Sequence, residues 1–163
     1  MALDMFLKIA TIDGETIDKE KAKTKEIDIL AWSWGVSQSG TTHMGGGAGS
    51  GKANFQDISV TKYVDSASHA LLLACATGEH FKTAKLTVRK AGKTQIEYIT
   101  IEMTEVIITS VSTGGSGGED RLTENISLNF AKVKFAYTPQ KADGTAGTPL
   151  PMTYNIAQNT KEG

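Results

Sequence analysis

Residues 122–137 read Leu-Thr-Glu-Asn-Ile-Ser-Leu-Asn-Phe-Ala-Lys-Val-Lys-Phe-Ala-Tyr, and Pro139 follows two residues later. Apolar side chains recur at every second position, as expected of a β-strand with one buried face. They occupy even positions in the first half and odd positions in the second: Ile126, Leu128 and Phe130, then Val133, Phe135 and Tyr137. This change of parity predicts a β-bulge near Ala131-Lys132, a feature that bends a sheet towards a barrel.

Similar strand patterns, separated by turn signals, recur along most of the chain. Strands are expected at residues 5–9, 27–38, 55–60, 84–90, 95–112 and 152–157. Several long strands with little helix predict a mainly β fold, a two-sheet antiparallel β-barrel. The chain has 163 residues and no linker-like bias, so residues 1–163 are expected to form one domain.

One helix interrupts the strands and is expected over about residues 65–77. Asp65-Ser66 offers N-cap side chains, and Gly78 can end the helix in a left-handed conformation. Between them, apolar residues follow the helical period: Ala67, Ala70, Leu71 and Ala74. Three successive leucines at positions 71–73 make this helix apolar on more than one side, which predicts that both sides are covered.

The strand expected at residues 27–38 has two unlike faces. Its bulky side consists of Leu30, Trp32, Trp34 and Val36, and its small side of Ala31, Ser33, Gly35 and Ser37. The small, weakly polar face is suited either to water or to a close neighbour.

Residues 39–52 contain six glycines and few apolar anchors, and they are too many for a tight hairpin turn. We expect either a flexible flap or an extended arm that another element orders. Gly46 to Ala53 matches the phosphate-binding pattern G-x-x-x-x-G-K, except that Ala53 stands where Ser or Thr would bind magnesium. Because residues 53–61 read as a strand, and that motif must open a helix, the sequence argues against nucleotide binding.

Charge and hydropathy argue against several classes of partner. The chain has 17 basic and 18 acidic residues and a net charge of −1, which offers no basic excess for nucleic acid or an anionic membrane. No apolar run approaches the ~20 residues that cross a bilayer, and residues 1–10 lack the features of a signal peptide. We expect a soluble protein made in the cytoplasm that, if it is exported, leaves without a cleaved leader.

Residues with catalytic or metal-binding chemistry form no recognisable pattern. His43, His69 and His80 lack the spacing of metal ligands. The single cysteine, Cys75, lies in an apolar run, where a free thiol behaves as a small hydrophobe. We therefore expect no cofactor, no metal and no enzymatic activity.

Seven segments in a fixed order carry a resemblance to a known family. They are residues 1–9, 26–35, the glycine-rich arm ending at Gly51-Lys52, 61–68, 85–92, 112–125 and 139–144. The sixth reads Ser-Thr-Gly-Gly-Ser-Gly-Gly-Glu-Asp-Arg-Leu-Thr-Glu-Asn. Together these segments resemble the Hcp family, the inner-tube protein of the type VI secretion system. The chain departs from the family at Tyr154-Asn155-Ile156, where relatives often carry a tryptophan.

The resemblance implies a β-barrel flanked by one helix, related in fold to phage tail-tube proteins and assembled as a homohexameric ring. It further implies stacked rings that form a hollow secreted tube, with a VgrG spike at its tip, a contractile sheath and effectors in the lumen. The family's extended loop contacts a neighbouring subunit and the next ring, and it corresponds here to Ser39, Gly40, Thr41, Thr42, His43, Met44, Gly45, Gly46, Gly47 and Lys52. Within such a ring, the small face of Ala31, Ser33 and Ser37 is the candidate channel wall.

Two other interpretations stay open at this point. The first is a binding module, monomeric or a small oligomer, built on a similar barrel. The second is a nucleotide-dependent enzyme that uses the near-match loop at residues 46–53. A closed ring seen by microscopy would separate the tube subunit from the first, and saturable ATP binding would favour the second.

Overall fold

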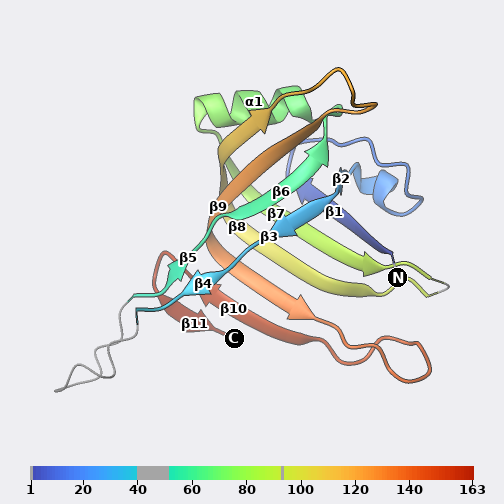
Figure 1. Ribbon diagram of the computed structural model, residues 1–163. Coiled ribbons are helices and arrows are strands. Elements are labelled where there is room, and N and C mark those ends of the chain that lie inside the picture. The colour runs from blue at the N-terminus through green and yellow to red at the C-terminus, as the bar shows by residue number, and fades with distance from the viewer. Residues whose placement is uncertain (1, 40–51, 93) are drawn as a thin grey trace.

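The computed structural model of the protein describes residues 2–39, 52–92 and 94–163, and Figure 1 shows their arrangement. The strands are β1 (Leu3–Ile9), β2 (Ile27–Ile29), β3 (Ala31–Ser33), β4 (Val36–Ser37), β5 (Asn54–Phe55), β6 (Ile58–Tyr63), β7 (His80–Lys90), β8 (Glu97–Thr113), β9 (Thr123–Tyr137), β10 (Leu150–Asn155) and β11 (Thr160–Glu162). The helical segments are the 3-10 turn η1 (Lys21–Thr24) and the helix α1 (Ser68–Thr77). The predicted mainly β, antiparallel fold with one α-helix is confirmed.

Strand β9 organises the sheet because it pairs with three other strands. Strand β8 follows one of its edges, while β6 pairs with its first half and β10 with its second half. The main path of the sheet runs β11-β10-β9-β8-β7-β1-β2, with β6 and β3 attached beside the first half of β9. Strands β4 and β5 form a separate two-stranded ribbon, labelled in Figure 1.

The sheet curls around a core without closing into a complete barrel. Strand β2 pairs with β1, and β3, which follows after a single residue, pairs with β6. At that residue the Leu30 N–H donates to the Thr61 carbonyl at 2.8 Å. Among the described residues no ladder joins β2 to β6, so the predicted two-sheet barrel is a single curled sheet with a small ribbon beside it.

The long strand predicted at residues 27–38 is divided into β2, β3 and β4. The reason is that each segment has a different partner, namely β1, β6 and β5. Its bulky face is correspondingly interrupted: Trp32 and Trp34 pack against the core, whereas Leu30 and Val36 are 40% and 54% exposed.

The change of parity in residues 122–137 is confirmed, but a bulge at Ala131-Lys132 is not its cause. The pairing of β8 with β9 keeps its register there and shifts between Ile108 and Ser110 instead. Strands β7, β8 and β9 all change from odd to even or even to odd buried positions at the same level of the sheet. On one side of this level the buried residues are Ala84, Met103 and Val133, and on the other side they are Phe81, Val106 and Phe130. Glu105 at this level has φ 55°, and the pairings of β8 with β7 and β9 keep their register there, so no strand carries an extra residue.

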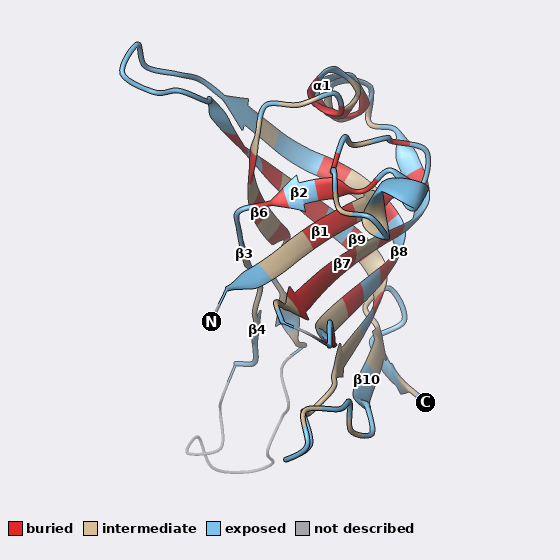
Figure 2. Ribbon diagram, turned by 90° about the vertical axis from the view of Figure 1, so that its right-hand side faces the viewer, coloured by how far each residue is buried: buried red, intermediate tan, exposed pale blue. Residues whose placement is uncertain are grey.

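The core lies inside the curl, and helix α1 packs across it against β8. Figure 2 shows the buried positions gathered along β1, β6, β7 and β9, whereas exposed positions dominate the loops. The buried cluster includes Leu7, Leu86, Ile101, Ile126 and Leu128, none of which has measurable exposure. The described residues contain no helix with the length and hydropathy that a membrane span requires.

Helix α1 ends as predicted but begins three residues later. Gly78 ends it with φ 69°, the left-handed conformation that glycine adopts readily. At the other end, the Ala67 N–H donates to Asp65 Oδ1 at 2.9 Å, in the turn that precedes the helix. The capping chemistry of Asp65 therefore forms this turn, and the helix starts at Ser68.

Candidate functional site

One side of the curled sheet carries two rows of small, uncharged side chains. Cross-strand partners in an antiparallel sheet point to the same side. The pairings align Ser33, Ser59, Ser127 and Ser110 in the first row, and Ala31, Thr61, Asn125 and Ser112 in the second. We call these eight positions the hydroxyl face; it spans β3, β6, β9 and β8 and lies on the side away from the core.

The hydroxyl face contains two of the three residues predicted for the channel wall. Ala31 and Ser33 lie in β3 and are exposed, whereas Ser37 lies in the β4–β5 ribbon opposite Asn54. Sequence reasoning did not identify the six other positions of the face. The alternation at residues 58–63, where Ser59 and Thr61 oppose buried neighbours, was the available signal.

The opposite end of the same sheet has a different chemistry. There a row of charged residues crosses β1, β7, β8 and β9: Lys8, Lys85, Glu102 and Lys134. This row thus places three lysines and one glutamate at one end of the outer side of the sheet, whereas the hydroxyl face at the other end contains no charged side chain. This division restricts the regions of the surface that can attract charged partners.

The β4–β5 ribbon is held to the main sheet by a cluster of aromatic rings. Trp34 lies 6.0 Å from Phe55 and 6.4 Å from Phe135, and Phe55 lies 5.0 Å from Tyr154, between ring centroids. Such ring pairs contribute about 0.5–1.5 kcal/mol each beyond the area they bury. These contacts fix the position of the ribbon relative to the main sheet.

A second contact anchors the same region to the sheet. The Asp57 carboxylate accepts hydrogen bonds from Thr109 Oγ1 at 2.7 Å and from Asn129 Nδ2 at 2.9 Å. Thr109 is the residue at which the register of β8 with β9 shifts. The irregularity therefore presents a hydroxyl group that fixes the turn between β5 and β6.

The loop residues predicted to contact other subunits begin and end at this ribbon. Ser39 and Lys52 are exposed at its two ends. The remaining predicted positions lie outside the described residues: Gly40, Thr41, Thr42, His43, Met44, Gly45, Gly46 and Gly47. Strands β5 and β6 follow Lys52, in agreement with the predicted strand after the near-match to a phosphate loop.

Helix α1 presents an apolar surface to the outside. Leu71 is completely buried, whereas Leu72 and Leu73 are 44% and 64% exposed. The expectation that both sides of the helix are covered is therefore not met within one chain. Adjacent exposed leucines of this kind mark a candidate contact with another protein surface.

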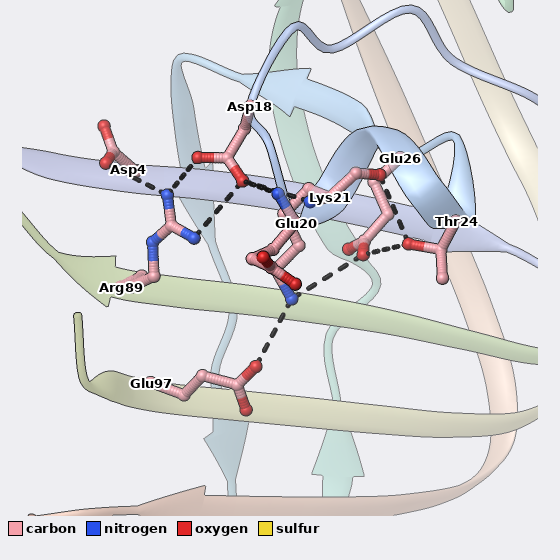
Figure 3. Close-up of polar contacts among 8 residues, drawn as sticks. All are labelled: Asp4, Asp18, Glu20, Lys21, Thr24, Glu26, Arg89 and Glu97. Atoms are coloured by element: carbon pink, nitrogen blue, oxygen red, sulfur yellow. Dashed lines mark hydrogen bonds and ion pairs between the residues drawn. The ribbon is translucent and has the colours of Figure 1, made fainter.

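A network of ion pairs, shown in Figure 3, holds the chain before β2 against the outside of β1 and β7. Arg89, which is 4% exposed, bonds to Asp18 and contacts Asp4 at 3.5 Å. The hydrogen bond from Arg89, with backbone N–H groups such as that of Lys21, lowers the pKa of Asp18 to about 2. Asp18 in turn raises the pKa of the Arg89 guanidinium, mainly through the same hydrogen bond.

The same network covers part of the charged stretch at residues 18–25. Lys21 Nζ lies 3.6 Å from Glu26 Oε2 and 3.3 Å from Glu97 Oε1, and its side chain is only 13% exposed. Thr24 Oγ1 donates to Glu26 at 2.7 Å. Lys21 and Glu97 are 76 residues apart in the sequence, so no local pattern predicts this contact.

Residues that bind metals do not cluster in the part of the chain that the structure describes. No group of three or more His, Cys, Asp or Glu side chains is arranged there to hold a metal ion. His69 and His80 are both exposed, and Cys75 is a half-buried free thiol. The most distinctive features of the described residues are accordingly surfaces: the hydroxyl face, the ribbon and the exposed leucines of α1.

Comparison with known proteins places this fold among secretion proteins. The family model described as "Type VI secretion system effector, Hcp" matches residues 6–137. Protein hcp1 of Pseudomonas aeruginosa is 57% identical over 163 residues, which cover 99% of each chain. A structure titled "Structure of a type six secretion system protein" matches with a TM-score of 0.91 and 30% identity over 99% of this chain and 100% of that one. Hcp1 from Salmonella typhimurium matches with a TM-score of 0.79 and 31% identity over the same shares.

Fold and sequence together define a type VI secretion protein. The family match covers most of the chain, and the relative from Pseudomonas aeruginosa extends the likeness to almost its whole length. The chain belongs to the Hcp family.

Proposed function

We propose that this chain is the subunit of the type VI inner tube, in which six copies form a ring and the rings stack around a hollow channel. The observation that carries the proposal is the hydroxyl face, which supplies a wall of eight small, uncharged side chains on four adjacent strands. Charged or large apolar walls would bind some proteins strongly and repel others. A wall of hydroxyl groups and one amide instead offers weak hydrogen bonds to protein cargo of many kinds.

The exposed surfaces of the subunit support a ring. A cyclic assembly joins two different surfaces of each copy, so each subunit needs two unlike patches. The leucines at 72 and 73 offer one apolar patch on α1, and Leu150 and Met152, 60% and 42% exposed on β10, offer another at a distant part of the fold. In this proposal such patches are covered by neighbouring copies.

The arm at residues 39–52 takes the stacking role in this proposal. Its base is fixed by the aromatic cluster and by Asp57, so force or contact at the arm is transmitted to the main sheet. Deletion of Gly45 to Gly49, which lie outside the described residues, should spare the ring and weaken the stacking of rings. Tube formation that is unchanged by this deletion would count against the stacking role.

The solution mass tests the ring directly. Light scattering, with negative-stain images of the same fraction, should give a six-subunit mass and ring-shaped particles. A monomer at high concentration would contradict the proposal that the subunit forms rings by itself. A saturable interaction with ATP in equilibrium dialysis would instead favour an enzyme.

The remaining partners follow from the tube role. We place a VgrG spike at the tip of the tube, a contractile sheath around it and effectors in its channel. The chain would be made in the cytoplasm and leave the cell with the apparatus. Copurification of effectors with the ring, and their loss when the hydroxyl face is altered, would support this arrangement.

A further inference from the structure

A buried lysine lies at the point where α1 meets the sheet. Lys62 in β6 has no exposed surface, and its cross-strand partner Glu124 in β9 is 1% exposed. Lys62 forms an ion pair with Glu124, and its Nζ lies 2.9 Å from Asp65 Oδ1 and 3.3 Å from Ser68 Oγ. Ser68 Oγ also donates to Glu124 at 2.6 Å. We call these four residues the buried lysine network.

The network connects the first residue of α1 to two strands. Ser68 is the first residue of the helix, Lys62 belongs to β6 and Glu124 to β9. The Asp65 N–H donates to Ser68 Oγ at 2.9 Å, so that this hydroxyl group is held from both sides. The position of the first helical turn is thereby fixed relative to the sheet.

Apolar packing alone defines the rotation of α1 poorly. The helix places Ala67, Leu71 and Ala74 against the core, a narrow strip with a single large side chain. A rotation of about 100° would bring Ser68, Leu72 and Cys75 to the places of Ala67, Leu71 and Ala74, and the sheet would again face a strip with one large apolar side chain. A helix that is apolar on all sides has no preferred buried side on hydrophobic grounds.

We propose that the buried lysine network sets the rotation of α1 and thereby decides that Leu71 is buried while Leu72 and Leu73 face outwards. Buried ion pairs contribute little net stability compared with apolar residues of the same volume, but they penalise arrangements that leave a charge unpaired. A rotated helix would carry Ser68 away from Lys62 and Glu124 and would leave buried polar groups without a partner. Only the use of the outward leucines as a subunit contact rests on the proposed function.

The chain contains its own probe for this proposal. Cys75 is the only cysteine and is half-buried on α1, so its rate of reaction with a soluble maleimide reports how α1 is seated. The test variant is the triple change Lys62→Met, Asp65→Asn and Glu124→Leu, which removes the lysine together with both of its carboxylate partners and keeps the site filled. Lys62→Met alone would leave two carboxylates without their lysine, and such a variant can simply unfold.

Assembly must not hide the thiol, so the comparison is made in a Leu73→Glu background with the solution mass recorded for each sample. The matched control is Arg89→Met, which breaks the other buried ion-pair network, away from α1. We expect the triple variant to remain folded and to react at Cys75 at least about tenfold faster, because α1 samples other orientations. We expect Arg89→Met to leave the rate within about twofold.

Each outcome decides the proposal. An unchanged Cys75 rate in a folded triple variant would overturn it, because apolar packing would then suffice to orient the helix. A triple variant that fails to fold would also overturn it, because the network would then be a source of stability instead of orientation. A wild-type protein that never forms rings would refute the proposed function while leaving this comparison intact, since it is read from one helix in one chain.

Discussion

Replacing Asp18 by asparagine should lower the free energy of unfolding at neutral pH by about 1–2 kcal/mol. The pKa of Asp18 is lowered from 3.8 to about 2, chiefly by its hydrogen bond from Arg89. Each pKa unit corresponds to about 1.4 kcal/mol, so the full shift gives roughly 2.5 kcal/mol. The Asp18 side chain keeps 21% of its surface exposed. Solvent therefore screens the interaction with Arg89, and the expected loss of stability falls to about 1–2 kcal/mol.

The pH dependence of this effect has a definite sign. Because the folded pKa lies below the unfolded one, the carboxylate stabilises the fold above about pH 4, and this contribution disappears as the pH falls to about 2. Urea unfolding followed by tryptophan fluorescence at pH 7, 4, 3 and 2, at one protein concentration, would measure it. The wild-type and Asp18→Asn proteins should differ most at pH 7 and converge at the lowest pH.

Two results would refute this reasoning. One is equal stability of the two proteins at pH 7, and the other is a difference that persists unchanged at pH 2. The matched control is Glu20→Gln, which removes an exposed ion pair with Lys23 and should change stability by less than about 0.5 kcal/mol.

The remaining predictions concern the other surfaces. Ser33→Gln should leave the ring mass unchanged and reduce effector retention in a copurification assay, and loss of the ring would show instead that this face lies in an interface. Leu73→Glu should weaken ring assembly at least about tenfold in light scattering, because a charge would replace an exposed leucine at a subunit contact; an unchanged mass would place the contact elsewhere. Trp34→Ala should cost about 2–3 kcal/mol in urea unfolding, less than a fully buried tryptophan, and a loss below about 1 kcal/mol would show that the aromatic cluster does not hold the ribbon. Gly14→Ala should cost about 1–3 kcal/mol, because its Cβ would lie 2.4 Å from the Glu26 carbonyl oxygen, and a neutral result would mean that this turn adjusts freely.

Local patterns in the sequence predict much of the fold. The long strands β8 and β9 lie where the alternation of apolar residues predicts them. The end of α1 was predictable because it depends on one local property, the left-handed conformation that Gly78 adopts. The division of residues 27–38 could not be predicted in the same way. It depends on which strand lies beside each segment, and the partners β1, β6 and β5 are separated along the chain.

The functional surfaces are less accessible to sequence reasoning. Each of the four serines in the first row of the hydroxyl face lies on a different strand. The row therefore depends on the register of three strand pairs, which no single segment of the sequence reveals. Lys62 is a similar case, since lysine is almost never fully buried unless it is paired. Its partner Glu124 lies 62 residues away, so the pair becomes apparent only when β6 and β9 are side by side.

The three partners of β9 have a consequence for the synthesis of the protein. Until residues 123–137 have left the ribosome, β3 is the one partner that β6 has among the described strands, and β7 is the one that β8 has. At roughly 5–20 residues per second, the 62 residues between Lys62 and Glu124 take roughly 3–12 s to translate. During this time the edges of β6 and β8 that pair with β9 stay unpaired in the nascent chain. Folding of the sheet is therefore completed only after most of the polypeptide has been synthesised. A message truncated before codon 123 would yield an aggregation-prone fragment in place of a smaller working subunit.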